Sequence, residues 1–291
     1  MRTVTRTVSA PHASGVVEAR PVQPGPSLFE TVVLGVIQGI TEFLPISSDG
    51  HLALAQRFFG HEPSLAVTVL LHAGTLAATL IILRDRVLAA LREAFAALSA
   101  PSTLQASQGG RDAVAVVVAT IPTGIVGLSL KHSVEAWSDS PTIIGLCLLG
   151  TTAAVLLASR APEGKRTEPT LGAAALVGVA QGLAALPGLS RSACTIAALL
   201  WAGVARQRAF ELSFLLSLPA VAGALLLEGR KAFSGGADPA NLIVGTLVSF
   251  AFGVVALLAL RRILAAGRFA FFAVYLVPLA LACLAWGHAA P

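Results

Sequence analysis

Two short polar segments contain the acidic, basic and hydroxyl side chains that could take part in catalysis. The first begins with Gln-Gly-Ile-Thr-Glu over residues 38–42. Gln38 and Glu42 are four positions apart, so on a helix their side chains share one face. Glu42 is followed directly by Phe43 and two further apolar residues within four positions. This setting favours a functional, membrane-embedded carboxylate over the alternative, a carboxylate at an interfacial helix end.

The same segment continues after Pro45 with Ile-Ser-Ser-Asp-Gly-His over residues 46–51. Ser and Asp before a helix are common N-caps, and we expect that role here. The free N–H groups of a first helical turn also bind anions, so Ser47, Asp49 and Gly50 are candidate phosphate-binding residues. Ser48 and His51 add a hydroxyl and an imidazole, which phosphoryl transfer can use as nucleophile and general acid/base. Other histidines are interpreted as structural: His12, His61, His132 and His288.

The second polar segment reads Pro-Gly-Leu-Ser-Arg-Ser over residues 187–192. Arg191 is the only charged residue between Glu168 and Arg206. The alternative to a functional role is an arginine that extends to the membrane interface, which is hard to reach from mid-segment. Opposite the first segment, Arg191 would bind a phosphate in bidentate fashion, with the flanking residues Ser190 and Ser192 as further binding groups.

The composition predicts an integral membrane protein. Hydrophobic residues make up 55% of the 291 positions and charged residues only 12%, about half the ~25% of an average soluble domain. The basic residues lie in pairs at the ends of apolar runs, which argues against a nucleic-acid partner. The three cysteines lie in apolar stretches without metal-binding spacing and are interpreted as inert. The proline-rich residues 1–27 are expected to be a disordered tail.

The apolar segments predict an all-α polytopic fold with six full spans and two re-entrant helical hairpins. Hairpin 28–60 is broken at Pro45, and hairpin 171–204 is broken at Pro187. Such breaks are tolerated in a membrane where protein or a cavity satisfies the backbone. The expected spans are about 64–83, 112–130, 141–159, 208–228, 241–260 and 269–288.

The two hairpins resemble each other and indicate an internal repeat. Residues 35–40 (GVIQGI) match residues 178–183 (GVAQGL), and a Leu-Pro pair follows each. The predicted repeats are 28–159 and 170–288, each with one hairpin and three spans. Because three is odd, the second repeat should be inverted relative to the first.

Charge gives the orientation, because cytoplasmic loops hold the excess of Lys and Arg. If the first full span runs inward, twelve basic residues lie in cytoplasmic loops, and only Lys131, Arg230 and Lys231 lie in the opposite loops. Three arginines of the N-terminal tail argue weakly for the reverse. We therefore expect both termini outside, with the first hairpin entering from outside and the second from the cytoplasm.

Residues 35–54 and 181–224 resemble the two signature regions of the undecaprenyl-diphosphatase family, also called bacitracin-resistance proteins. The resemblance implies a phosphoric anhydride hydrolase that removes the terminal phosphate of a C55 polyprenyl diphosphate. It would recycle this peptidoglycan lipid carrier at the outer face of the bacterial inner membrane, with a divalent cation. The family motifs fall on Gln38, Glu42, Ser47, Ser48, His51, Ser190, Arg191 and Ser192.

Two positions depart from the usual family pattern. Members commonly have Thr where this chain has Asp49, and Gly where it has Ala193. The carboxylate of Asp49 could join metal binding or repel the substrate, so its role stays open. Ala193 adds a methyl group at a tight turn, and we expect only a change in packing.

The resulting hypothesis is metal-assisted phosphoryl transfer, which needs positioning and charge neutralisation. Glu42 and Gln38 would hold Mg²⁺ or Ca²⁺, Arg191 would hold the β-phosphate, and Ser48 or His51 would attack. A transporter or flippase for the same lipid is the alternative, because inverted repeats with broken helices are typical of transporters. The expected partners are the lipid substrate and the bilayer; a homo-oligomer is compatible with the sequence, which does not set the oligomeric state.

Overall fold

The computed structural model of the chain describes residues 25–234 and 238–289, so most of the predicted tail 1–27 lies outside the described residues. Within them the protein is helical, and no named strand is present. The elements are α1 (Leu28–Phe43), α2 (Ser48–Phe58), α3 (Leu65–Ile82), α4 (Arg84–Ala96), α5 (Thr103–Ala106), α6 (Gln108–Trp137), α7 (Pro141–Arg160), α8 (Leu171–Leu183), α9 (Arg191–Trp201), α10 (Arg206–Ser234), α11 (Pro239–Ala265), η1 (Phe269–Phe271) and α12 (Phe272–Ala289).

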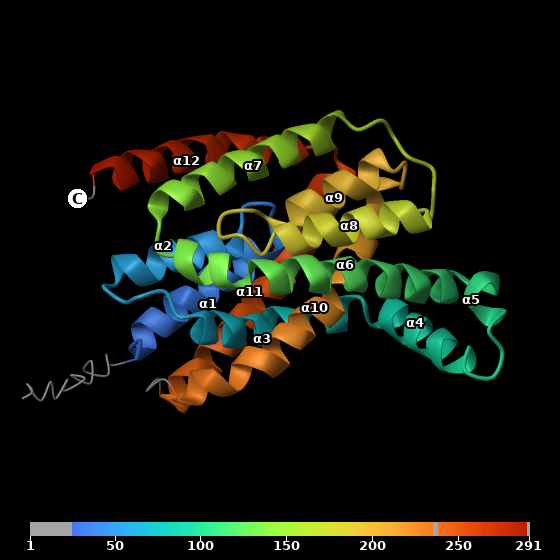
Figure 1. The fold of residues 1–291 in the computed structure, drawn as a ribbon, viewed down its shortest axis with the longest axis horizontal. Helices are drawn as coiled ribbons and strands as arrows, with labels where there is room; N and C mark the ends of the chain where they lie inside the picture. Colours follow the sequence, from blue (N-terminus) through green and yellow to red (C-terminus); the bar gives the residue numbers. More distant parts are fainter. Residues whose placement is uncertain (1–24, 235–237, 290–291) are drawn as a thin grey trace, which may run out of the picture.

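The long apolar helices confirm the prediction of a polytopic membrane protein. Among the described residues, α6, α7, α10, α11 and α12 are each long and apolar enough to cross a membrane. Helix α3 makes a sixth span if it is counted with α4, to which it is joined by a bend of 82°. In Figure 1 these helices run side by side along the long axis of the molecule.

The lipid-facing character of the bundle shows in the apolar side chains that its surface exposes. On α6 the side chains of Val117, Ile121, Ile125 and Leu128 are all more than half exposed. They recur every three or four residues, which places them on one face of the helix. A face of this kind is stable against hydrocarbon rather than water, so the exposed apolar surface agrees with the span assignment.

The predicted hairpins are present as two pairs of short helices. Helix α1 ends at Phe43, just before Pro45, and α2 begins at Ser48. Helix α8 ends at Leu183, before Pro187, and α9 begins at Arg191. Figure 1 shows the turns of both pairs in the middle of the bundle.

The first helix of each hairpin packs along a long helix from the other half of the chain. Helix α1 packs along α11, and α8 packs along α6. Glycines allow both contacts, because a Cβ on Gly35 would lie 2.5 Å from the carbonyl oxygen of Gly245, and one on Gly178 would lie 2.2 Å from that of Ala119. Small residues let helix backbones approach closely in membranes. The hairpins are thus clamped against long helices that cross the whole bundle.

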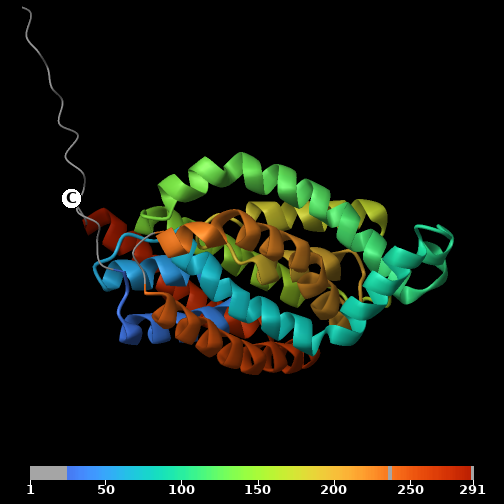
Figure 2. The same ribbon diagram turned by 90° about the horizontal axis from the view of Figure 1, so that it is seen from below.

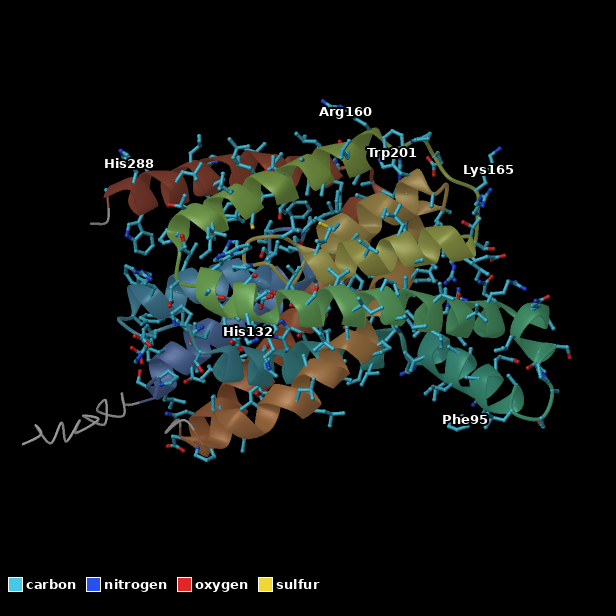
Figure 3. The ribbon with its side chains drawn as sticks, in the orientation of Figure 1. Phe95, His132, Arg160, Lys165, Trp201 and His288 are labelled. Carbon is cyan, nitrogen blue, oxygen red and sulfur yellow. The ribbon has the colours of Figure 1, made fainter. Side chains whose placement is uncertain are left out.

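Helices α4 and α5 occupy a segment, 84–111, that the sequence interpretation treats as a loop between spans. Figure 2 shows that they project from one end of the bundle, and Figure 3 places Phe95 and Lys165 at that same end. On α4 the apolar side chains of Leu88, Leu91 and Phe95 are exposed at helical spacing. The segment therefore forms an amphipathic helical hairpin with the start of α6. We call the end of the bundle from which α4 and α5 project the basic end.

Candidate active site

The candidate site lies where the two hairpin turns meet. Glu42 comes from the last turn of α1, Ser48 from the first residue of α2, and Arg191 from the first residue of α9. Pro45 and Pro187 explain this placement, because the residue before a proline disfavours the helical conformation and proline lacks an N–H. Each break therefore ends a helix in mid-bundle and lets the next helix start with its N-terminus near the same point.

Backbone features at both turns fix the helix starts. Ser47 caps α2, and its hydroxyl accepts a hydrogen bond from the Gly50 N–H at 3.4 Å. Its φ of 71° is the one positive φ among the described non-glycine residues. Such strain persists where the surroundings enforce it, often at functional sites. Ser190 caps α9 in the usual extended conformation and accepts from the Ala193 N–H at 3.3 Å.

Glu42 is the hub of the site, and its buried carboxylate receives contacts from three other elements. Arg191 donates from Nη2 to Oε1 of Glu42, which joins the two hairpins. Ser48 Oγ donates to Oε2 at 2.7 Å. His72 Nε2, on α3, lies 3.0 Å from the same oxygen, and Gln38 Nε2 donates to it at 3.1 Å.

Arg191 keeps one end of its guanidinium available. The group lies over the ring of Phe214, with Cζ 5.7 Å from the ring centroid. Its Nη1 is buried and has no hydrogen-bond partner among the described residues. A buried donor without a partner costs free energy unless a ligand satisfies it. Because a guanidinium binds phosphate through two nitrogens, Nη1 marks where a phosphate oxygen would be held.

A cavity of about 560 Å³ opens onto these groups. Its polar wall includes Glu42, Ser48, Asp49, Ser190 and Arg191, together with Ser47 and His72. Its other wall is apolar and is formed by α3, α6 and α10, with Val69, Leu128, Val221 and Leu227 among its residues. At Gly124, Gly127 and Gly223, which also line it, an added Cβ would meet only open space. A charged end and an apolar wall match an amphiphilic ligand.

The structure places His51 differently from the other predicted site residues. Its Nδ1 lies 2.7 Å from the carbonyl oxygen of Ser47, and its Nε2 lies 2.8 Å from the hydroxyl of Tyr275 on α12. The two rings are stacked, with centroids 5.8 Å apart. His51 is not among the residues that line the cavity. Both ring nitrogens therefore already have partners, and Nε2 is directed at Tyr275, which does not line the cavity.

The remaining predicted residues hold the two turns together. Ser192 Oγ donates to the carbonyl oxygen of Leu44 at 3.4 Å and lies 3.2 Å from the hydroxyl of Ser190. Gly50 faces Gly188, because a Cβ on Gly50 would lie 3.0 Å from the Cα of Gly188. Ser192 and Gly50 thus pack the turns against each other, while Ser190 also reaches the cavity.

His72 is a further residue of the site, outside the two polar segments that the sequence singles out. It lies in the middle of α3 and was hidden within an apolar run, but ionisable residues inside a span are rare and usually functional. That rule, applied to every span rather than to the polar segments alone, would have identified it. What it could not show is that α3 packs beside α1, which brings His72 to Glu42.

Gln38 and Glu42 do not fit the metal pair that the sequence predicts. Gln38 directs its amide Nε2 at Glu42 and leaves Oε1 buried without a partner. Oε2 of Glu42 already has three nitrogen or hydroxyl neighbours. A cation there would face Arg191 and an amide N–H. Among the described residues, no three His, Cys, Asp or Glu side chains are arranged to hold a metal ion.

The chain is similar to a known protein family and to several named proteins. The family model described as bacitracin resistance protein BacA matches residues 31–282. A protein of Desulforapulum autotrophicum named undecaprenyl-diphosphatase is 42% identical over 260 residues, which cover 85% of this chain and 94% of that protein. Proteins of the same name from Treponema denticola and Bacteroides fragilis are each 36% identical, over 90% and 85% of this chain and 99% and 93% of their own.

Proposed function

The chain belongs to the bacitracin resistance protein BacA family, and we propose that it is an undecaprenyl-diphosphatase that converts polyprenyl diphosphate into polyprenyl phosphate and phosphate. The observation that carries this proposal is the contact of Arg191, Glu42 and Ser48 at the charged end of an otherwise apolar cavity. A hydroxyl, a carboxylate that can accept its proton and a guanidinium with an unpaired donor supply the positioning and charge neutralisation that phosphoryl transfer needs.

In the proposed reaction Ser48 Oγ attacks the terminal phosphorus of the diphosphate. Its proton passes to Oε2 of Glu42, to which it is already hydrogen-bonded at 2.7 Å. The bond between that phosphorus and the bridging oxygen breaks, and polyprenyl phosphate leaves with the bridging oxygen, which takes up the proton from Glu42. Water then hydrolyses the phosphoserine and restores Ser48. We favour Ser48 over His51 as the attacking group because Nε2 of His51 faces Tyr275 instead of the cavity.

Arg191 and the helix N-termini would neutralise the transferred phosphate. Nη1 of Arg191 supplies one donor, and the first turns of α2 and α9 direct backbone N–H groups and the positive ends of their dipoles towards the turns. Donors fixed before the reaction stabilise the developing charge without reorganising. This explains why both hairpins break in mid-bundle.

The apolar wall of the cavity supports a lipid substrate. The open space at Gly124 and Gly127 on α6 and at Gly223 on α10 leaves room for a chain of isoprene units. The same helices expose apolar side chains to the surroundings, as Ile121 and Leu226 do. We propose that the prenyl chain leaves the site along these two helices. The relatives are named undecaprenyl-diphosphatase, which favours hydrolysis over transport as the activity.

A divalent cation, Mg²⁺ or Ca²⁺, stays in the proposal only as a companion of the diphosphate. Because Gln38 and Glu42 do not fit it, we expect substrate-free protein to bind neither ion at this site. Isothermal titration of Mg²⁺ and Ca²⁺ into the protein tests this separately from activity. Saturable binding that Glu42→Gln abolishes would restore Gln38 and Glu42 as the metal pair.

The proposed location is the bacterial inner membrane, with the site open to the outer side. The basic end of the bundle, where Lys165 lies (Figure 3), would face the cytoplasm. The cavity lining includes Lys131, Glu135 and Ser138 near the opposite end of α6. The diphosphate would therefore enter from the outer side.

Phosphate release by the purified protein tests the function. Wild-type protein in proteoliposomes should release phosphate from undecaprenyl diphosphate, and Ser48→Ala should release far less at equal folded concentration. Folded wild-type protein that releases no phosphate would refute the proposal, and movement of the lipid between leaflets without hydrolysis would support the transport alternative.

A further inference from the structure

His72 lies between the two carboxylates of the cavity. Its Nε2 is 3.0 Å from Oε2 of Glu42 and 3.8 Å from Oδ1 of Asp49. The side chain is 15% exposed, whereas that of Asp49 is 41% exposed. His72 also lines the cavity with both carboxylates. His72 thus lies within ion-pair distance of both acidic side chains at the substrate end.

The contacts of the ring define its protonation state. Nδ1 lies 2.8 Å from the carbonyl oxygen of Thr68, which can only accept, so Nδ1 carries a hydrogen. Nε2 faces Glu42, which is ionised because it is paired with the permanently charged Arg191. An ionised carboxylate also only accepts, so Nε2 carries a hydrogen as well. His72 is therefore an imidazolium.

The charges at the substrate end then balance. Glu42 and Asp49 supply two negative charges, and Arg191 and His72 supply two positive charges. Lys131 and Glu135 line the cavity farther along α6 and add one charge of each sign. Without His72, one guanidinium would face two carboxylates, and a diphosphate would meet net repulsion at short range, where screening is weak.

We propose that His72 is a positioning residue with two separable tasks. Its Nε2–H holds Glu42 in place for Ser48, and its charge offsets Asp49 so that an anionic substrate can enter. The pair of His72 and Asp49 gives a role to the carboxylate whose function the sequence leaves open. This inference rests on the proposed function.

Three variants separate the two tasks. His72→Gln keeps an N–H donor of similar reach but removes the charge, so KM should rise roughly tenfold while kcat changes little. Adding Asp49→Asn should bring KM back to within about threefold of its wild-type value, because the uncompensated anion is gone. His72→Leu removes the donor too, so kcat should fall by ~10²-fold, and Asp49→Asn should not restore it.

His61 provides the matched control. It pairs with Glu30 at 3.3 Å near the start of α1, away from the cavity lining. His61→Gln should leave KM and kcat unchanged, even if the melting temperature falls. An unchanged KM in His72→Gln, or a double variant whose KM is not restored, would overturn the proposal.

Binding of a non-hydrolysable prenyl diphosphonate keeps this inference distinct from the proposed function. Its Kd should rise in His72→Gln and recover in the double variant, as KM does. That binding pattern in a wild-type protein without phosphate release would refute hydrolysis and support the pairing of His72 with Asp49. An unchanged Kd in His72→Gln would refute the pairing whatever the activity.

Discussion

Ser48 Oγ and Glu42 Oε2 are 2.7 Å apart, although a proline break separates the helices that carry them. The carboxylate already accepts a hydrogen bond from the serine hydroxyl in the resting structure, so no rearrangement is needed before attack. At the same time Arg191 holds the other oxygen of Glu42. One carboxylate therefore orients both the attacking hydroxyl and the cation that faces the phosphate.

Replacing Glu42 by Gln should abolish nearly all phosphatase activity. Gln keeps the shape, but it removes the negative charge that pairs with Arg191 and His72 and that accepts the serine proton. We expect kcat to fall by at least ~10²-fold, the scale of general base catalysis, in phosphate-release assays per folded protein.

Glu30 is the matched control for this change, since it lies on the same helix and also pairs with a histidine. Glu30→Gln should retain wild-type turnover. Near-normal turnover in Glu42→Gln would remove Glu42 from the chemistry.

Replacing Arg191 by Lys and by Ala separates geometry from charge. Lysine keeps a positive charge but not the planar fork whose Nη1 is left for the phosphate. Lys should lose much of the activity and Ala nearly all of it, with a loss of ~10²–10³-fold in kcat for a removed stabilising donor.

The alternative for Arg191 is a purely structural tie between the hairpins. Both variants would then show a lower yield and melting temperature but near-normal phosphate release per folded molecule. Measuring turnover and melting on the same preparations decides between the two roles.

The topology is tested by cysteine reporters in a variant that lacks Cys147, Cys194 and Cys283. Reporters in 131–140 and 229–240 should react with an impermeant thiol reagent on intact cells, because these segments are expected outside. Reporters in 84–111 and 160–168 should react only after the membrane is opened. The reverse labelling pattern would place the basic end outside and contradict the proposed orientation.

A buried charge cluster near the basic end should matter for stability and not for chemistry. Arg208 on α10 contacts Asp112 and Glu211 at 2.6 Å each and donates to the carbonyl oxygen of Thr167 at 2.9 Å. Arg208→Met would leave two buried carboxylates without this partner, at a cost of about 3–5 kcal/mol.

The measurement is thermal unfolding in detergent, together with turnover per folded molecule. Arg84→Met is the control, because its pair with Asp85 is exposed and such pairs contribute about 0–1 kcal/mol. A melting temperature equal to that of the control would show that the cluster does not stabilise the bundle.

The sequence predicts the breaks at Pro45 and Pro187 and places Arg191 opposite the first polar segment, because proline chemistry and an isolated charge are local signals. It does not predict the contact of His72 with Glu42, since that depends on how α3 packs against α1. Helix α4 was missed because its arginines suggest a loop, although its apolar residues recur at helical spacing. The amide orientation of Gln38, on which the metal assignment depends, is likewise set by tertiary neighbours.

The glycine contacts of α1 with α11 and of α8 with α6 have a consequence for the order of assembly. Helix α8 can dock as soon as it is synthesised, because its partner α6 precedes it. Helix α1 must wait for α11, which follows it by some two hundred residues of chain. During biosynthesis the first hairpin is therefore left without its main support while the second is already seated. A premature stop before α11 should consequently yield a product whose first hairpin is exposed to quality-control proteases.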